Sequence, residues 1–219
     1  MPKIPYIWYN IIMNGKFIVF EGPDGSGKTT ILKKVNEILV SENYKVNVFR
    51  EPGGTKISEK IRDIIIDNDN IEMSDKTEAL LFAASRSQLV EEKFKPLLKK
   101  GEIILSDRYV LSSLTYQGVG RKLGIKEVEA INNFATSGIK PDLTIFFDID
   151  YKEALLRKRA NFSADRLENE DFQFHKDIFD AYLDMAEKFK KDIVKIDASL
   201  SIDEVTANVL SLIYKILED

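Results

Sequence analysis

Short apolar runs alternate with longer amphipathic segments along most of the chain. Five runs are rich in β-branched and aromatic residues, as buried strands are, and they lie at residues 16–21, 45–49, 103–105, 143–147 and 193–196. The clearest helical patterns lie at residues 28–40, 76–99 and 201–217, where apolar positions repeat with a period near 3.6 residues. Strands that alternate with helices predict an α/β fold, with a parallel sheet covered by helices on both faces.

No internal repeat, low-complexity tract or linker interrupts this pattern, so we expect a single domain over residues 13–219. Residues 1–12 differ, because they carry two prolines and three large aromatic side chains before Met13. They form either a docking or dimer-lining arm, or an N-terminal extension upstream of an alternative start at Met13. We favour the extension.

The composition narrows the possible functions. The net charge of −4 and the pI near 5.3 argue against a protein that binds nucleic acid or an anionic membrane. Without cysteine and with one histidine, His175, the chain has no thiol nucleophile and little prospect of a zinc site, and the cytoplasm is its expected compartment. No apolar run suits a membrane span. His175 is expected at the surface or in packing rather than in catalysis.

One motif predicts a nucleoside triphosphate site. The sequence GPDGSGKT at residues 22–29 matches G-x-x-x-x-G-K-[ST], and it stands between a predicted strand and a predicted helix. Its glycines let backbone N–H groups surround a phosphate, its lysine reaches the β- and γ-phosphates, and its threonine offers a hydroxyl to Mg²⁺. A plain glycine-rich turn is the weaker alternative, and Thr30 stands where a dinucleotide fingerprint needs its third glycine. The residues expected to bind ATP are Gly22, Pro23, Asp24, Gly25, Ser26, Gly27, Lys28, Thr29 and Thr30.

A second feature follows the strand predicted at residues 103–105. Asp107 would stand at the carboxyl end of that strand, beside the phosphate loop, where a carboxylate can hold the water shell of a metal ion. Arg108 comes next and could bridge phosphates. An acidic residue at this place can also cap a helix, so the pair gains weight only with the phosphate loop. We therefore expect Thr29 and Asp107 to serve Mg²⁺.

Several further motifs resemble those of the bacterial thymidylate kinases, from Lys16 to the C-terminus. The motifs that carry the resemblance lie at residues 20–30, 50–55, 80–88, 106–118, 141–148, 164–168 and 196–198, and they include REPGGT and DRY. The resemblance implies a P-loop nucleoside monophosphate kinase fold with a five-stranded parallel sheet and flanking helices. It also implies transfer of the γ-phosphoryl group of ATP to dTMP, giving dTDP and ADP for dTTP biosynthesis, and a homodimer.

The resemblance also assigns residues to the nucleoside of dTMP. Phe82 looks like the ring that stacks on thymine, and Arg86 is similar to the arginine that donates to the thymine O4. Ser113 and Gln117 resemble residues that bind the base edge, and Tyr116 resembles the tyrosine under the deoxyribose. The alternatives are that Phe82 and Tyr116 are core residues and that Arg86 is solvated.

For the phosphate of dTMP, the resemblance points to Arg50 and Arg62, whose guanidinium groups suit bidentate binding, together with Arg108. Arg62 falls on an apolar-periodic helix, so it could also be a surface arginine. Asp24 resembles the carboxylate that accepts from the 3′-hydroxyl. The turn that begins at Glu51 is expected to supply backbone shape rather than chemistry.

Charge stabilisation at the transferring phosphoryl group is expected to come partly from a lid. The variable positions of the phosphate loop hold no arginine, whereas residues 157–168 are basic and rich in small residues, as a lid is. Arg157 is assigned to ATP, and Arg159 and Arg166 are the catalytic candidates, with the choice between them open. Asn161 stands where some relatives carry a further arginine. The alternative is a solvated basic helix end.

The expected mechanism is in-line transfer by positioning and charge neutralisation, centred on Lys28 and Arg108, with no general base because the acceptor phosphate is already ionised. Two rivals stay open. A kinase acting on thymidine itself would need a carboxylate base for the 5′-hydroxyl, and Arg50 argues against it. A non-catalytic nucleotide-binding regulator would bind ATP without forming dTDP.

Overall fold

The computed structural model describes residues 14–158 and 165–218 of the 219-residue chain. The predicted extension at residues 1–12, the catalytic candidate Arg159 and the neighbouring Asn161 lie outside the described residues. No helix in the described part is long and apolar enough to cross a membrane.

Five parallel strands form one sheet in the order β2-β3-β1-β4-β5. The strands are β1 (Phe17–Glu21), β2 (Val46–Arg50), β3 (Ile103–Asp107), β4 (Leu143–Asp148) and β5 (Ile193–Asp197). Each of the five apolar runs seen in the sequence forms one of them. The prediction of an α/β fold with a five-stranded parallel sheet is confirmed.

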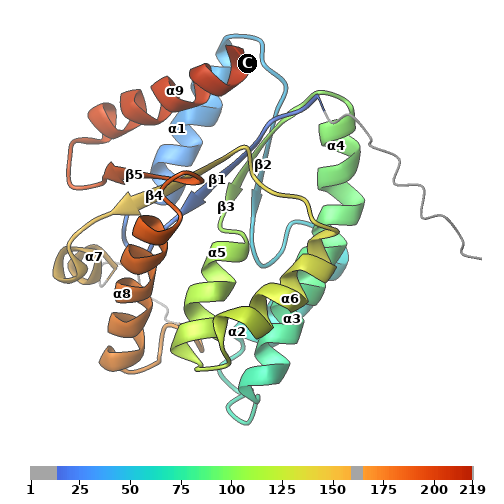
Figure 1. Ribbon diagram of the computed structural model, residues 1–219, viewed down its shortest axis with the longest axis vertical. Helices are drawn as coiled ribbons and strands as arrows, with labels where there is room; N and C mark the ends of the chain where they lie inside the picture. Colours follow the sequence, from blue (N-terminus) through green and yellow to red (C-terminus); the bar gives the residue numbers. More distant parts are fainter. Residues whose placement is uncertain (1–13, 159–164, 219) are drawn as a thin grey trace, which may run out of the picture.

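Helical segments connect the strands and cover both faces of the sheet (Figure 1). In chain order they are α1 (Lys28–Ser41), α2 (Lys56–Ile66), α3 (Asp75–Leu89), the π-helical turn η1 (Val90–Phe94), α4 (Lys95–Lys99), α5 (Val110–Ser113), the π-helical turn η2 (Leu114–Gly120), α6 (Ile125–Thr136), α7 (Tyr151–Lys158), α8 (Phe172–Lys188) and α9 (Ile202–Glu218). The helical pattern of residues 76–99 is therefore three consecutive segments. Pro96 near the start of α4 explains the interruption, because proline cannot donate the hydrogen bond that an unbroken α-helix needs there.

The central strand β1 is buried on both faces, which explains why its sequence is almost continuously apolar. Ile18 and Phe20 contact the hydrophobic cluster formed with α1 and α9. Phe17 and Val19 point the other way, into a cluster built from α3, η1 and α4. Helix α8 covers Phe146 of β4 in a third cluster. A strand at the centre of a parallel sheet has no polar face to keep.

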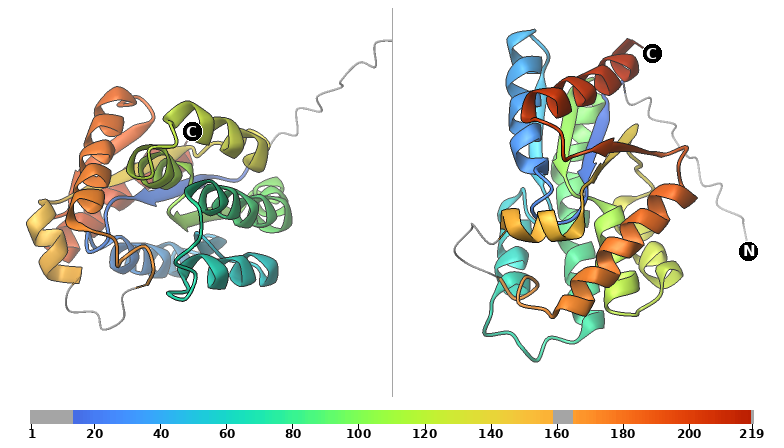
Figure 2. Two further views of the ribbon diagram at one scale, coloured as in Figure 1. Left: turned by 90° about the horizontal axis from the view of Figure 1, so that it is seen from below. Right: turned by 90° about the vertical axis from the view of Figure 1, so that its left-hand side faces the viewer.

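This topology brings three separate motifs to one edge. Phe20, Asp107 and Arg50 stand in register across β1, β3 and β2, each close to the carboxyl end of its strand. Helix α7 follows β4 and lies beyond the same ends of the strands (Figure 2). In open parallel sheets, ligands bind outside the carboxyl ends of the strands, so this edge is where a site is expected.

Candidate active site

The loop between β1 and α1 forms a phosphate cradle that only glycine can shape. Gly25 has a φ of +84°, and a Cβ atom there would lie 2.2 Å from the carbonyl oxygen of Ala154. Helix α1 begins after Gly27 without a side-chain cap and without an acidic residue in its first turn. The N–H groups of its first turn are therefore free to bind an anion, and the helix dipole favours one.

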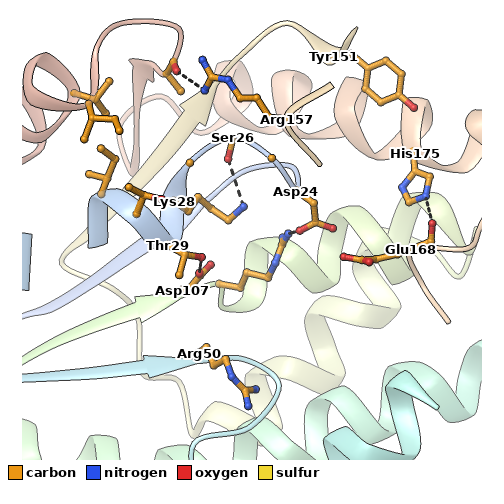
Figure 3. Close-up of a pocket in the computed structure, with 18 of the residues that line it drawn as sticks. Asp24, Ser26, Lys28, Thr29, Arg50, Asp107, Tyr151, Arg157, Glu168 and His175 are labelled. Atoms are coloured by element: carbon orange, nitrogen blue, oxygen red, sulfur yellow. Dashed lines mark hydrogen bonds and ion pairs between the residues drawn. The ribbon is translucent and has the colours of Figure 1, made fainter. Parts of the chain in front are cut away.

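Lys28 bends back over this loop. Its Nζ donates to the carbonyl oxygens of Gly22 and Pro23 at 2.9 and 2.8 Å, and more weakly to Ser26 Oγ at 3.4 Å (Figure 3). Burial, followed by the charge of Arg108, lowers the pKa of Lys28 to about 8. A phosphate in the cradle would supply the negative charge that this buried ammonium group lacks.

The two residues predicted to serve a metal ion do meet. Thr29 Oγ1 donates to Asp107 Oδ2 at 2.7 Å, at the junction of β3 and α1 (Figure 3). The described residues contain no group of three or more histidine, cysteine or acidic side chains suited to a metal. One hydroxyl and one carboxylate fit Mg²⁺, which prefers oxygen and takes most of its coordination from phosphates and water.

Arg108 stands between two adjoining cavities. Its Nη2 donates to Asp24 Oδ1 at 2.5 Å, while its Nη1 donates to Ser112 Oγ and Tyr182 OH at 3.0 Å each. Its guanidinium also lies 5.2 Å from the centre of the Tyr116 ring, a cation–π contact. The side chain is thus fixed from several sides before any ligand binds.

The larger cavity, of about 1120 Å³, contains the phosphate cradle, and the smaller, of about 160 Å³, lies beside it. Asp24, Arg62 and Arg108 are among the residues that line both. Groups bound in the two cavities would therefore meet next to Arg108. This arrangement suits transfer of a group from one ligand to another.

Two more arginines lie near this junction. The Nη1 atoms of Arg50 and Arg62 both donate to the carbonyl oxygen of Pro52, at 2.8 and 3.1 Å, and Arg50 Nη2 donates to Glu59 at 2.9 Å. Burial, followed by the charge of Arg50, lowers the pKa of Arg62. Two guanidinium groups that converge on one carbonyl leave excess positive charge, which favours an anionic group such as a phosphate.

Arg86 forms one wall of the smaller cavity and is 1% exposed, which rules out the solvated alternative. Its Nε donates to Glu51 Oε2 at 2.6 Å, and its Nη2 donates to the carbonyl oxygen of Tyr109 at 2.9 Å. Its Nη1 donates to Ser113 Oγ at 2.9 Å and to Asn132 Oδ1. These contacts engage four of the five guanidinium hydrogens among the described residues, leaving one Nη2 hydrogen for a ligand.

The expectation that Glu51 supplies only backbone shape is wrong. Its carboxylate is buried against Arg86, and burial raises its pKa to about 7 despite that partner. No described donor reaches Glu51 Oε1. The sequence holds no local signal for this pair, because the two residues stand 35 positions apart.

Arg157 is another lining residue of the larger cavity. Arg157 Nη1 donates to the carbonyl oxygen of Ala198 at 3.2 Å, and its Nη2 donates to Glu153 at 2.6 Å (Figure 3). Thr30 and Ile202 also line the larger cavity. His175 lines this cavity too, and its Nε2 lies 3.4 Å from the carbonyl oxygen of Glu168.

The comparison with known proteins decides the family. A family model described as thymidylate kinase matches residues 20–209. The chain belongs to the thymidylate kinase family. A thymidylate kinase of Finegoldia magna is 49% identical over 90% of this chain and 97% of its own length. One of Thermoanaerobacter sp. strain X514 is 47% identical over 94% of this chain and its whole length.

A solved structure agrees. The crystal structure of thymidylate kinase from Ehrlichia chaffeensis superposes with a TM-score of 0.74 and 28% identity, covering 91% of this chain and 98% of that one. The family predicted from the sequence motifs is therefore confirmed, as is its P-loop nucleoside monophosphate kinase fold.

Most of the predicted site residues in the described part of the chain line one or both cavities; Gly22 and Pro23 do not, although their carbonyl oxygens accept from Lys28, and neither does Arg166. Phe82, Tyr116 and Gln117 line the smaller cavity with Arg86. Arg166 lines neither cavity, because its Nε donates to the carbonyl oxygen of Ile65 at 2.9 Å and its Nη2 to Glu78 at 2.7 Å. The catalytic role expected of Arg166 stays a prediction.

Proposed function

We propose that this chain transfers the γ-phosphoryl group of ATP to the 5′-phosphate of dTMP, giving dTDP and ADP, with Mg²⁺. The observation that carries the proposal is the junction of the two cavities at Arg108, with a phosphate cradle on one side and a buried arginine-lined pocket on the other. A coupled assay of ADP release across nucleoside monophosphates tests it. We expect dTMP to be the fastest acceptor, and thymidine to be inactive.

On the donor side, the N–H groups of α1 and the ammonium group of Lys28 would hold the β- and γ-phosphates. Mg²⁺, held by Thr29 and Asp107 through oxygen, would neutralise charge on the phosphates when bound. The adenosine would lie in the part of the larger cavity bounded by Arg157, Thr30 and Ile202. Arg157, which donates to the carbonyl oxygen of Ala198 directly after β5, supports this division.

On the acceptor side, Arg50, which lines the larger cavity, and Arg62, which lines both, would bind the phosphate of dTMP where the two cavities adjoin. Arg108 would bridge this phosphate and the transferring group, because it lines both cavities. Asp24 would accept from the 3′-hydroxyl. The acceptor oxygen is ionised at neutral pH, so the reaction needs no general base, and we assign no chemistry to His175.

The base and sugar would fill the smaller cavity. Phe82 would stack on thymine, and the unpaired Nη2 hydrogen of Arg86 would donate to O4. Ser113 and Gln117 would face the base edge, and Tyr116 would lie below the deoxyribose, where its ring leaves little room for a 2′-hydroxyl. The burial of Arg86 supports this assignment, because an arginine held by Glu51 has little freedom to follow another base.

We propose that the lid at residues 157–168 adds a cation in the transition state, from Arg159, Arg166 or both. The contacts of Arg166 to Glu78 and Ile65 favour Arg159, since Arg166 would have to break both contacts to reach a phosphoryl group. Arg166 would instead hold the end of the lid to α2 and α3. Loss of an arginine that acts in this way costs a large factor in kcat.

We also propose a homodimer formed by one domain of residues 13–219 from each chain, located in the cytoplasm. Helices α3 and α6 contact each other, and each exposes a large apolar side chain, Leu80 at 55% and Phe134 at 89%. A second copy that packs on α3 and α6 would remove both apolar side chains from water, which favours association. Light scattering of the purified chain measures the assembly.

A further inference from the structure

A buried carboxylate stands behind the smaller cavity. Glu78, in the first turn of α3, is 1% exposed. Its Oε1 accepts from Gln117 Nε2 at 2.9 Å, and its Oε2 accepts from Arg121 Nη2 and Arg166 Nη2 at 3.0 and 2.7 Å. One carboxylate thus joins α3, η2 and the end of the lid. The sequence motifs gave Glu78 no role.

The charge state of Glu78 determines what it can bind. Burial raises its pKa, but the hydrogen bonds from Arg121, Gln117 and Arg166 outweigh burial and hold the pKa below its ordinary value. The carboxylate is therefore ionised at neutral pH, and an ionised carboxylate can only accept hydrogen bonds.

This acceptor fixes which way the amide of Gln117 faces. The amide nitrogen must point at Glu78, because the amide oxygen in that place would meet a negative charge. The oxygen, Gln117 Oε1, then turns the other way. Gln117 lines the smaller cavity, and no hydrogen-bond donor among the described residues reaches that oxygen.

We propose that Glu78 sets base specificity by holding the amide of Gln117 so that its oxygen faces the base, beside the N–H donor of Arg86. The cavity then offers one donor and one acceptor to the base edge. Thymine matches this pattern, because its O4 accepts and its N3–H donates. Cytosine presents the reverse, an amino donor and an N3 acceptor. This role rests on the proposed function, since it assumes that the smaller cavity binds the base of the acceptor.

The other partners of Glu78 give a matched control. Arg121 also pairs with Glu170 at 2.6 Å, so Glu170→Gln loosens Arg121 without changing the group that faces Gln117. By contrast, Glu78→Gln keeps the size of the side chain but can donate as well as accept. The amide of Gln117 could then flip and present its nitrogen to cytosine N3. Glu78 acts here as a positioning residue, because it touches Gln117 and not the substrate.

The test is the ratio of kcat/KM for dTMP to kcat/KM for dCMP in the full-length enzyme. We expect Glu78→Gln to lower this ratio by about tenfold or more, partly by raising kcat/KM for dCMP, because a mismatched buried hydrogen-bond group costs at least that factor. The loss of the contact to Arg166 would lower kcat/KM for dTMP and for dCMP by the same factor, so it would not change the ratio. Glu78→Asp, which can still only accept, should keep most of the wild-type ratio, and so should Glu170→Gln.

A double-mutant cycle shows whether Glu78 acts through the amide. Gln117→Leu should lower the ratio by itself, and adding Glu78→Gln should change the ratio no further. If Glu78→Gln does not fold, Glu78→Met removes the acceptor and takes its place in the same cycle. An unchanged ratio in an active Glu78→Gln variant, or an equal loss in Glu170→Gln, would overturn the role of Glu78. A wild-type enzyme without activity on dTMP would instead contradict the proposed function.

Discussion

The Nε atom of Arg86 lies 2.6 Å from Oε2 of Glu51, and both side chains are almost completely buried between the end of β2 and helix α3. The arginine that forms a wall of the smaller cavity is therefore held by an acid that titrates near neutral pH, since burial raises the pKa of Glu51 to about 7. A buried ion pair costs desolvation energy, so its value here lies in the fixed orientation of Arg86 rather than in stability.

This raised pKa predicts how stability depends on pH. Between the unfolded pKa of 4.5 and about 7, the folded protein holds a proton on Glu51 that the unfolded chain has released. Folding is thus favoured at low pH, and the contribution of Glu51 to the free energy of unfolding falls as pH rises through this window, then levels off above it. Urea denaturation of wild type and Glu51→Gln at pH 5 to 8 measures the difference. If the free energy of unfolding of wild type, relative to that of Glu51→Gln, rose with pH, the raised pKa of Glu51 would be wrong.

Lys28→Ala should leave the fold intact and remove most of the activity. Its Nζ is the cation that covers the phosphate loop, and its loss removes a charge that would follow the phosphoryl group into the transition state. We expect kcat below about a tenth of wild type, with an unchanged circular dichroism spectrum. A folded variant with near-normal kcat would show that Lys28 does not stabilise the transition state.

Arg86 and Tyr116 should control different parts of the acceptor. Arg86→Ala should raise KM for dTMP and reduce the preference for dTMP over dCMP. Tyr116→Ala should reduce the preference for dTMP over the ribonucleotide TMP and leave the preference for dTMP over dCMP unchanged. Removing Arg86 leaves Glu51 buried without its partner, so Arg86→Ala is best measured together with Glu51→Gln. Equal changes in both preferences for both variants would indicate general loosening of the cavity instead.

Substitution of the two lid arginines, Arg159 and Arg166, should affect different kinetic constants. We expect Arg159→Ala to lower kcat by roughly a hundredfold with little change in ATP affinity, as removal of an arginine finger does. Arg166→Ala should instead raise KM for dTMP, because Arg166 holds Glu78 and the end of α2. Steady-state kinetics of both single variants and the double variant check this. Near-normal kcat in all three variants would mean that the cation stabilising the transferring phosphoryl group comes from Arg108 or from a partner subunit.

The sequence predicts the parts of this molecule that depend on local chemistry. The phosphate loop is determined by residues next to one another, since Gly25 and Lys28 serve the same turn. The sheet follows from apolar runs, because a strand buried on both faces has no polar positions. The apolar pattern of residues 76–99 predicts one continuous helix and does not show the π-helical turn, although Pro96 is a sequence signal for it.

Contacts between distant residues could not be predicted in the same way. Glu78 binds Arg166 across 88 positions, and Glu51 binds Arg86 across 35. Such pairs exist only once the sheet and helices have brought their elements together, and an isolated Glu in a helical pattern is usually solvated. The motifs therefore predict residues that line the two cavities, and not Glu51 and Glu78, the acids that hold Arg86 and Gln117 in place.

The most direct test of the account is to identify the products formed from ATP and each acceptor by anion-exchange chromatography. With dTMP, we expect dTDP and ADP to appear one for one, to depend on Mg²⁺, and to fall to a small fraction in Lys28→Ala. With thymidine, no dTMP should form, because thymidine lacks the phosphate that Arg50 and Arg62 would bind. ADP without dTDP, or phosphorylation of thymidine in place of dTMP, would contradict the account.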